Sequence, residues 1–284
     1  MGLIHYNIEK YSPQQLVIIP LVLLVISLLL VGINIATSGM PVKPGIDFSG
    51  GTAVTLDTTE TAEEVRMTFA GYPLSDVSEG VNNGKFLKFG AMDDAQFQSL
   101  TNLISEKYPN AKIDQIGESF GKTLQQQAVL ALLFSFIGMA IVIFLSFRTF
   151  VPSVAVVLSA FADIVMTAAA MNIVGIQLTL GTTAALLMLI GYSVDSDILL
   201  TNRVLKRQGK LADKLKGAFD TGIIMTSTTF AAITAMLVVS WIGSVQILFE
   251  ISAVLLIGLV FDVLNTWLTN AALLKWYVQK GGGK

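Results

Sequence analysis

Apolar residues run in six long stretches along the chain, and polar segments separate them. The first stretch, 16–36, holds 21 residues without a charge. A helix needs about 20 consecutive apolar residues to cross the hydrocarbon core of a bilayer. We therefore predict a polytopic α-helical membrane protein with six transmembrane helices. The later stretches lie at 128–147, 151–171, 180–201, 221–241 and 247–268.

The first stretch has an alternative interpretation as a secretory signal peptide. The apolar core of a signal peptide covers about 7–15 residues and ends at a small-residue cleavage site. The stretch 16–36 is longer, and no Ala-x-Ala pattern closes it. We interpret it as a retained first helix that follows a short N-terminal segment, 1–15, and we expect the other five helices within 128–274.

The polar segment 37–127 carries its own pattern of elements. Thr61 and Glu64 form a capping box at the start of a predicted helix. The sequence Asn82-Asn83-Gly84 is typical of a hairpin turn. The order strand-helix-strand-strand-helix-strand is that of an α+β ferredoxin-like fold, which hosts many functions. We expect an interaction or packing lobe here. The predicted strands are 52–56, 75–81, 85–90 and 112–116, and the predicted helices are 61–71 and 93–108.

Lysine and arginine gather at one set of helix ends. Eleven of them lie in 1–15, at Arg148, in 203–216 and in 275–284, whereas the loops 172–179 and 242–246 hold none. Cytoplasmic loops carry the excess of positive residues in membrane proteins. We predict a multi-pass protein of the cytoplasmic membrane with both termini in the cytoplasm, the tail being 275–284. The segment 37–127 then lies outside. The basic loop has a second interpretation as a contact for anionic lipid or a partner.

Composition excludes several classes of function. Charged residues make up only 13% of the chain, against about 25% in soluble domains. The net charge of −2 argues against a nucleic-acid binder. The chain has no cysteine and a single histidine, His5, which we expect at the surface, so we predict no metal site and no cofactor. The glycine-rich segment 45–51 lacks the Gly-Lys-Ser/Thr of a phosphate loop, and no nucleophile–base spacing indicates an enzyme.

Five acidic residues fall inside the apolar stretches. A charge at the centre of a membrane helix costs about 2.5–3.5 kcal/mol, so these residues should face the bundle interior or lie near a helix end. Glu250 is near an end. Helical rise places Asp163, Asp195 and Asp262 within about 10 Å of the midplane at one depth. Asp197 lies about 200° around its helix from Asp195, so these two cannot point the same way.

Polar side chains accompany these acids at helical spacing. No Lys or Arg lies inside a stretch, so the carboxyl groups must be protonated, hydrated, bonded to hydroxyls or paired with another subunit. Two interpretations stay open: a proton or cation relay, and protonated acids that join helices through hydrogen bonds. The relay candidates are Asp163, Asp195, Asp197 and Asp262, with Thr167, Asn202, Thr226, Thr229 and Thr266 as supporting polar residues.

Several motifs resemble those of the SecD/SecF family of protein-export membrane proteins, in the RND superfamily. The segment 45–51 (GIDFSGG) follows the first helix, and 190–197 (IGYSVDSD) lies in the fourth. The segments 162–165 and 226–229 resemble weaker motifs of the third and fifth helices. The likeness covers almost the whole chain and favours the archaeal type of SecF. The first motif consists of Gly45, Ile46, Asp47, Phe48, Gly50 and Gly51 around a variable position.

The resemblance implies a SecF-type subunit that pairs with SecD beside a SecYEG-type channel. Such a complex would promote export of the translocating polypeptide, with the proton gradient as the energy source. Bacterial relatives carry Asn-Asp-Thr where this chain has Asp195-Ser196-Asp197, so either aspartate could match the family carboxylate. The arginine that they carry on the fifth helix is absent from 221–224. An RND-type small-molecule exporter and a non-transporting scaffold for SecD are the alternatives.

Overall fold

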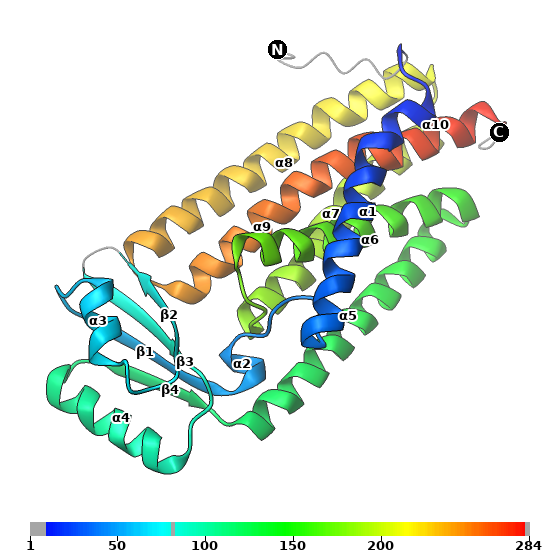
Figure 1. Ribbon diagram of the computed structural model, residues 1–284. Helices are drawn as coiled ribbons and strands as arrows, with labels where there is room; N and C mark the ends of the chain where they lie inside the picture. The colour runs from blue at the N-terminus through cyan, green and yellow to red at the C-terminus, as the bar shows by residue number, and fades with distance from the viewer. Residues whose placement is uncertain (1–9, 81–82, 282–284) are drawn as a thin grey trace.

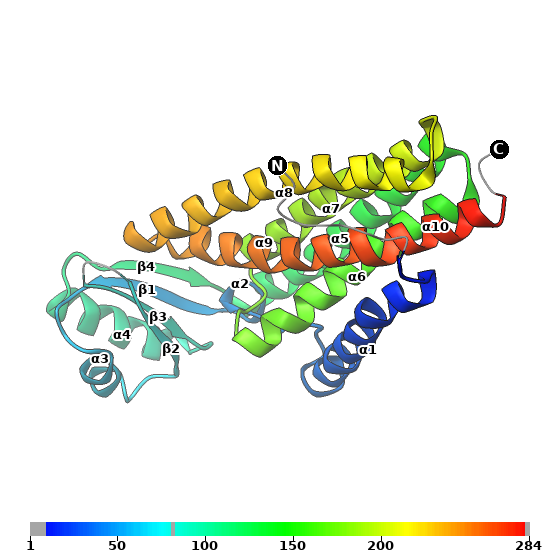
Figure 2. The same ribbon diagram turned by 90° about the horizontal axis from the view of Figure 1, so that it is seen from above.

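The computed structural model describes residues 10–80 and 83–281 and divides into a small lobe and a bundle of long helices (Figure 1). His5 and the first residue of the expected Asn82-Asn83-Gly84 turn lie outside the described residues. The lobe is inserted between the first and second long helices. Figure 2 shows that it sits at one end of the bundle, next to the ends of α8 and α9.

The lobe is a four-stranded antiparallel sheet with two helices. Its strand order is β2-β3-β1-β4, which is the ferredoxin-like arrangement, so the predicted α+β fold is confirmed. Helices α3 and α4 lie on the same side of the sheet (Figure 1). In chain order the elements are β1 (Gly51–Asp57), α3 (Ala62–Thr68), β2 (Leu74–Glu79), β3 (Gly84–Phe89), α4 (Asp94–Lys107) and β4 (Lys112–Ile116).

Alternation along the strands builds the core of the lobe. Val54 of β1 pairs with Leu87 of β3, and both side chains are buried. They pack with Phe69, which is fully buried at the end of α3. The capping box that starts α3 is present, because Thr61 accepts from the backbone N–H of Glu64 while the Glu64 side chain accepts from that of Thr61.

Within residues 10–80 and 83–281, six helices are long and apolar enough to cross a membrane, in agreement with the six predicted stretches. A short helix, α2 (Ile46–Ser49), lies between the first of them and the lobe. The last is continuous but contains one π-helical segment, η2 (Asn265–Asn270). The long helices are α1 (Pro13–Ser38), α5 (Glu118–Phe147), α6 (Phe150–Val174), α7 (Leu180–Lys206), α8 (Leu211–Ile242), and α9 (Gln246–Leu264) with η2 and α10 (Ala271–Gln279).

Three helices extend furthest beyond the apolar stretches that predicted them. Helix α5 begins at Glu118, α8 begins at Leu211, and the last helix continues to Gln279. The extra turns of α5 and α8 contain many polar and charged residues, so a hydropathy pattern does not mark them, although the backbone continues its hydrogen bonds. The last helix continues past the polar residues at 269 and 270. Lys214 and Lys216 therefore lie on α8 rather than in a loop.

Helices α6 and α7 are the most buried of the bundle, whereas α1, α5 and α8 are largely exposed (Figure 1). The exposed side chains are apolar, as at Leu29 of α1, Leu145 of α5 and Val239 of α8. The buried side chains include many hydroxyls, amides and carboxyls on α6, α7, α9 and η2. This distribution is the one expected of helices surrounded by lipid.

Candidate functional site: a buried carboxyl cluster

Three of the four candidate aspartates are brought together inside the bundle. Asp163 of α6 and Asp197 of α7 are fully buried, and Asp262 of α9 is 1% exposed. Asp195 is exposed on the outer face of α7. The expected cluster of Asp163, Asp195 and Asp262 is therefore wrong in one member, because Asp197 takes the place of Asp195.

The angular position of the residues on α7 explains this correction. Ser193, Ser196 and Asp197 are buried, whereas Gly191 and Asp195 are exposed. The expectation that Asp195 and Asp197 point in different directions is confirmed. Asn202, expected on the same face as Asp195, is half-buried. The face of α7 that turns inward was thus predicted wrongly for Asp195.

Asp163 is held by both neighbouring helices. The Ser193 hydroxyl donates to Asp163 Oδ2 at 2.6 Å, and the Asn265 amide donates to Asp163 Oδ1 at 2.7 Å. Thr167 is buried one turn further along α6, where its hydroxyl donates to the backbone carbonyl of Asp163 at 2.6 Å. The carboxyl group of Asp163 thus lies where α6, α7 and η2 meet.

Thr266 links the other two carboxyl groups. Its hydroxyl lies 2.9 Å from Asp197 Oδ1 and 3.1 Å from Asp262 Oδ1. The Asn270 amide also donates to Asp197 Oδ1, at 2.7 Å. A hydroxyl carries one hydrogen, so it donates to one carboxyl group and can accept only from a carboxyl group that is itself protonated. The geometry therefore suits a cluster that holds at least one proton.

The π-helical segment brings the amides to the acids. Asn265 and Asn270 are five residues apart, the spacing of one π-helical hydrogen-bonded turn, and both are fully buried. Such segments inside α-helices occur frequently at functional sites. Asn270 was missed by the sequence reasoning. The available signal was the run of polar residues at 265, 266, 269 and 270 within an otherwise apolar helix.

Neutral groups surround the cluster in the described part of the chain. The hydrogen bonds to Asp163, Asp197 and Asp262 come from amides and hydroxyls there. Among the described residues, no group of three histidines, cysteines or acids has the geometry of a metal site. An arrangement of this kind can load and release protons, and it can equally join the helices through hydrogen bonds.

The supporting residues expected on the fifth helix, α8, are placed differently. The Thr229 hydroxyl donates to the Met225 carbonyl of its own helix at 3.2 Å. Thr226 is buried on α8. The hydrogen bonds to the three carboxyl groups come from α7 and η2 instead, and Thr266 is the supporting residue that contacts two of the acids.

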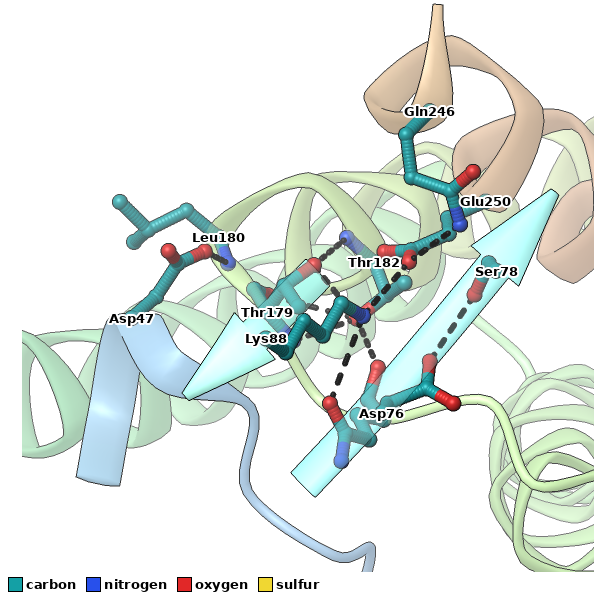
Figure 3. A network of polar contacts seen from close by, with 10 residues as sticks. Asp47, Asp76, Ser78, Lys88, Thr179, Leu180, Thr182, Gln246 and Glu250 are labelled. Carbon is teal, nitrogen blue, oxygen red and sulfur yellow. Dashed lines mark hydrogen bonds and ion pairs between the residues drawn. The ribbon is translucent and has the colours of Figure 1, made fainter. Parts of the chain in front are cut away.

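The glycine-rich motif, residues 45–51, leads into the lobe and is hydrogen-bonded to the start of α7. Its α2 turn places Asp47 so that Oδ2 accepts the backbone N–H of Leu180, the first residue of α7, at 2.8 Å (Figure 3). The Gly45 N–H donates to the Leu178 carbonyl at 2.8 Å. A carboxylate at a helix N-terminus satisfies a free N–H group and complements the helix dipole.

The remaining residues of the motif turn the chain into the lobe. Ile46 and Phe48 lie in the helical turn of α2, and Phe48 is buried in the core of the bundle. Gly50 and Gly51 have φ angles of 76° and 145°, which favour glycine. A Cβ atom at Gly51 would collide with the carbonyl oxygen of Phe89. The segment acts as a structural turn in this geometry.

A six-helix bundle with a buried carboxyl cluster, and a ferredoxin-like lobe after the first helix, defines a polytopic α-helical membrane protein. The family described as "Protein export membrane protein SecD/SecF, C-terminal" matches residues 96–280. A relative from Methanolacinia petrolearia, named "Protein-export membrane protein SecF", is 56% identical over 99% of this chain and 100% of its own. The chain belongs to the SecD/SecF family.

Other relatives and solved structures agree with this assignment. A protein of the same name from Haloferax volcanii is 41% identical over 96% of this chain and 95% of its own. A crystal structure of Thermus SecDF, titled a translocon-associated membrane protein, is similar with a TM-score of 0.75 and 21% identity, which shows the fold alone. The match covers 98% of this chain but only 40% of the solved chain, so this chain spans less than half the length of Thermus SecDF.

Proposed function

We propose that the chain is the SecF-type subunit of a SecD–SecF complex that promotes protein export across the cytoplasmic membrane. The names of the full-length relatives support protein export. The distribution of Lys and Arg supports cytoplasmic termini and a lobe, within 37–127, on the outer side. The lobe would contact the translocating polypeptide, and a SecYEG-type channel would be the neighbouring complex. Lipid would surround the apolar outer faces of the helices.

The carboxyl cluster supports coupling to the proton gradient. One hydroxyl between Asp197 and Asp262 makes the hydrogen bonding of the cluster depend on which carboxyl group holds a proton. Movement of one proton through the membrane potential supplies about 2.3 kcal/mol per 100 mV. Because the acids lie on α6, α7 and α9, a change in protonation would alter the packing of these helices. Proton transfer without covalent catalysis or a cofactor is the role that we assign to them.

An exposed acid on α7 supports SecD as a partner. Asp195 and Gly191 lie on the outer face of α7, within its apolar stretch. A carboxylate facing lipid at this depth costs about 2.5–3.5 kcal/mol, so a protein surface should cover it. A small side chain such as Gly191 permits close helix packing at that contact.

Co-purification tests the partner. The native protein is extracted from its own membranes in several mild detergents, and mass spectrometry identifies what accompanies it. Stoichiometric SecD is the expected result. A lone chain or a homotrimer, without SecD or channel subunits in any detergent, would contradict the proposal and favour a small-molecule exporter.

Secretion assays test the coupling. We expect a chain with Asp163→Asn, Asp197→Asn and Asp262→Asn to assemble with SecD but to lose the gradient-dependent part of secretion. Wild-type secretion with normal gradient dependence would eliminate the relay and leave the scaffold interpretation. A variant that fails to assemble with SecD would show that the acids act in folding rather than in coupling.

A further inference from the structure

Two of the contacts between the lobe and the bundle differ in kind. One runs through the backbone at the glycine-rich motif. The other consists of side chains of β3 and α9 (Figure 3). The two attachments reach the helices that carry Asp197 and Asp262. The difference between them indicates which part of the contact can open.

The backbone attachment is firm. Residue Gly45 donates to the Leu178 carbonyl and the Leu178 N–H donates to the Lys43 carbonyl, both at 2.8 Å, which forms a short parallel bridge before α7. A Cβ atom at Gly121 of α5 would lie only 2.9 Å from the Phe48 oxygen, so α2 and α5 are in close contact. The part of the motif before Gly50 therefore stays with the bundle.

The side-chain attachment is an ion pair with amide neighbours. Lys88 Nζ of β3 lies 3.1 Å from Glu250 Oε1 in the first turns of α9. Lys88 also lies 3.4 Å from Gln177 Oε1, just before α7, and the Gln246 amide donates to Glu250 Oε1 at 3.0 Å. The side chains of Lys88 and Glu250 are only 15% and 12% exposed. One lysine of the lobe thus contacts both the loop before α7 and the first turns of α9 (Figure 3).

Glycines mark both connections between the lobe and the bundle. The chain enters the lobe at Gly50 and Gly51, both with positive φ, and leaves it at Gly117, directly before α5. These two connections are adjacent, because Gly51 pairs with Ile116. Small residues at adjacent connections can absorb the changes in φ and ψ that a rigid-body rotation requires.

We infer that Lys88 and Glu250 form a latch, which opens when the lobe turns on Gly50, Gly51 and Gly117 and so releases the adjoining ends of α7 and α9. Opening removes the lysine from a carboxylate that is mostly buried at the edge of the bundle. A partly opened contact would leave this carboxylate buried without its partner, which is costly, so the contact favours two distinct states rather than a gradual range. The effect of the latch on export rests on the proposed function, whereas the latch itself rests on this geometry.

A distance measurement tests the latch without reference to export. The chain has no cysteine, so spin labels can be placed at Gln98→Cys on α4 and Val239→Cys on α8, both exposed, in the full chain with its partner. Wild type should give mainly the docked distance. Lys88→Met should add a second population, and Lys88→Glu combined with Glu250→Lys should restore the docked one.

Lys85→Met is the matched control for that measurement. Lys85 lies on the same strand and pairs with Glu79 of the lobe at 2.8 Å, so its loss should leave the docked distance unchanged. An identical distance distribution for Lys88→Met and wild type would overturn the latch. A shift of equal size in Lys85→Met would also overturn it, because the cause would then be a disturbed lobe.

A reversible disulfide bond between the lobe and the bundle tests whether export requires the latch to open. A Cβ atom at Gly80 would lie 3.2 Å from Cβ of Ser244 in the α8–α9 turn, near the 3.5–4.5 Å typical of disulfides. In the oxidised Gly80→Cys/Ser244→Cys protein, export should fall about fivefold or more, because coupling between two sites in a protein typically starts at about fivefold. Reduction should restore it, and each single variant should export normally.

Full export by the oxidised double variant would overturn the requirement for opening. If wild type itself fails to stimulate export, the proposed function fails, and the distance distributions still decide whether the latch exists. The two failures are therefore distinguishable.

Discussion

The lobe and the bundle bury opposite kinds of side chain. In the lobe, fully buried Phe69, Phe89 and Leu100 form an apolar core beneath a charged surface. In the bundle, Asp163 and Asn265 are fully buried while exposed positions are apolar. The surroundings explain the contrast, because water drives apolar groups inward and hydrocarbon cannot hydrogen-bond to polar ones.

This contrast separates stability from function in the two regions. Burial of apolar surface stabilises the lobe, so its core residues are needed for folding. Helices in lipid gain little from the hydrophobic effect between themselves, and a buried carboxyl group remains costly even when it is hydrogen-bonded. The cluster of Asp163, Asp197 and Asp262 therefore adds less to stability than apolar packing adds to the lobe, which supports the role in transport that we propose for it.

The largest expected loss of stability comes from the lobe core. Phe69→Ala should lower the free energy of unfolding of the lobe by about 3–5 kcal/mol, because it leaves a cavity under the sheet. Hydrogen exchange in the full chain should show faster exchange in β1 and β3, with α6 and α7 unchanged. Met67→Ala on α3, where the side chain is 70% exposed, is the control. Equal effects of the two substitutions would contradict the apolar-core description.

Overpacking should have a smaller effect in the bundle. A Cβ atom at Gly222 of α8 would collide with the ring of Trp267, so Gly222→Ala should cost about 1–3 kcal/mol. Tryptophan fluorescence during thermal unfolding in detergent measures this loss. A Cβ atom at Gly191 of α7 would have no neighbouring atom within 4 Å, so Gly191→Ala should leave the stability of the isolated chain unchanged. If Gly191→Ala also prevents SecD from co-purifying, that face of α7 is the contact with SecD.

Loss of a single hydroxyl in the cluster should cost less again. Thr266→Val keeps the shape of the side chain but removes the link between Asp197 and Asp262. Hydrogen bonds between membrane helices average about 0.6 kcal/mol and reach about 1.7. Thermal unfolding should show a loss in this range, together with altered gradient dependence of export. Thr229→Val, which affects a hydrogen bond within α8, should change neither.

The smallest effect is a pH-dependent one in the lobe. Hydrogen bonds from Tyr108 and Lys107 lower the pKa of Glu60 below its ordinary value of 4.5. The pKa of Tyr108 is raised, first by burial and then by its hydrogen bond to Glu60. The ionised glutamate thus stabilises the lobe above pH 4.5, and this contribution is lost as the pH falls through the lowered pKa. Glu60→Gln should cost about 0.2–1 kcal/mol at pH 7, since the Glu60 side chain is 30% exposed.

Hydrogen exchange at α4, corrected for intrinsic rates, measures that difference at pH 7 and near pH 4. The difference between Glu60→Gln and wild type should shrink at the lower pH. A difference that grows as the pH falls would contradict the assignment of an ionised Glu60.

The six long helices and the order of elements in the lobe could be predicted from the sequence. The length of an apolar run indicates whether a helix can cross a membrane, and alternation of apolar and polar residues indicates a half-buried strand. The inward face of α7 could not be predicted, because Asp195 and Asp197 are both acidic and polar residues lie on both faces of that helix. Hydrophobic periodicity orients a helix only when one face is clearly apolar.

Contacts between segments that are distant in the chain could not be predicted from the sequence either. Asp47 accepts from Leu180, and Lys88 pairs with Glu250, across large separations in the chain. Glu250 was recognised only as a residue near a helix end. A single sequence contains no local pattern for such contacts, since they depend on how the lobe docks on the bundle.

The comparison of Asp197→Asn with Asp195→Asn tests the central claim most directly. The two residues are neighbours on α7, the chemical change is the same, and only Asp197 lies in the cluster. Gradient-dependent export is measured in membrane vesicles with SecD present, before and after the gradient is dissipated. We predict that Asp197→Asn abolishes the gradient-dependent part while SecD still co-purifies, and that Asp195→Asn retains it. Normal gradient dependence in Asp197→Asn, or its loss in Asp195→Asn alone, would contradict the account.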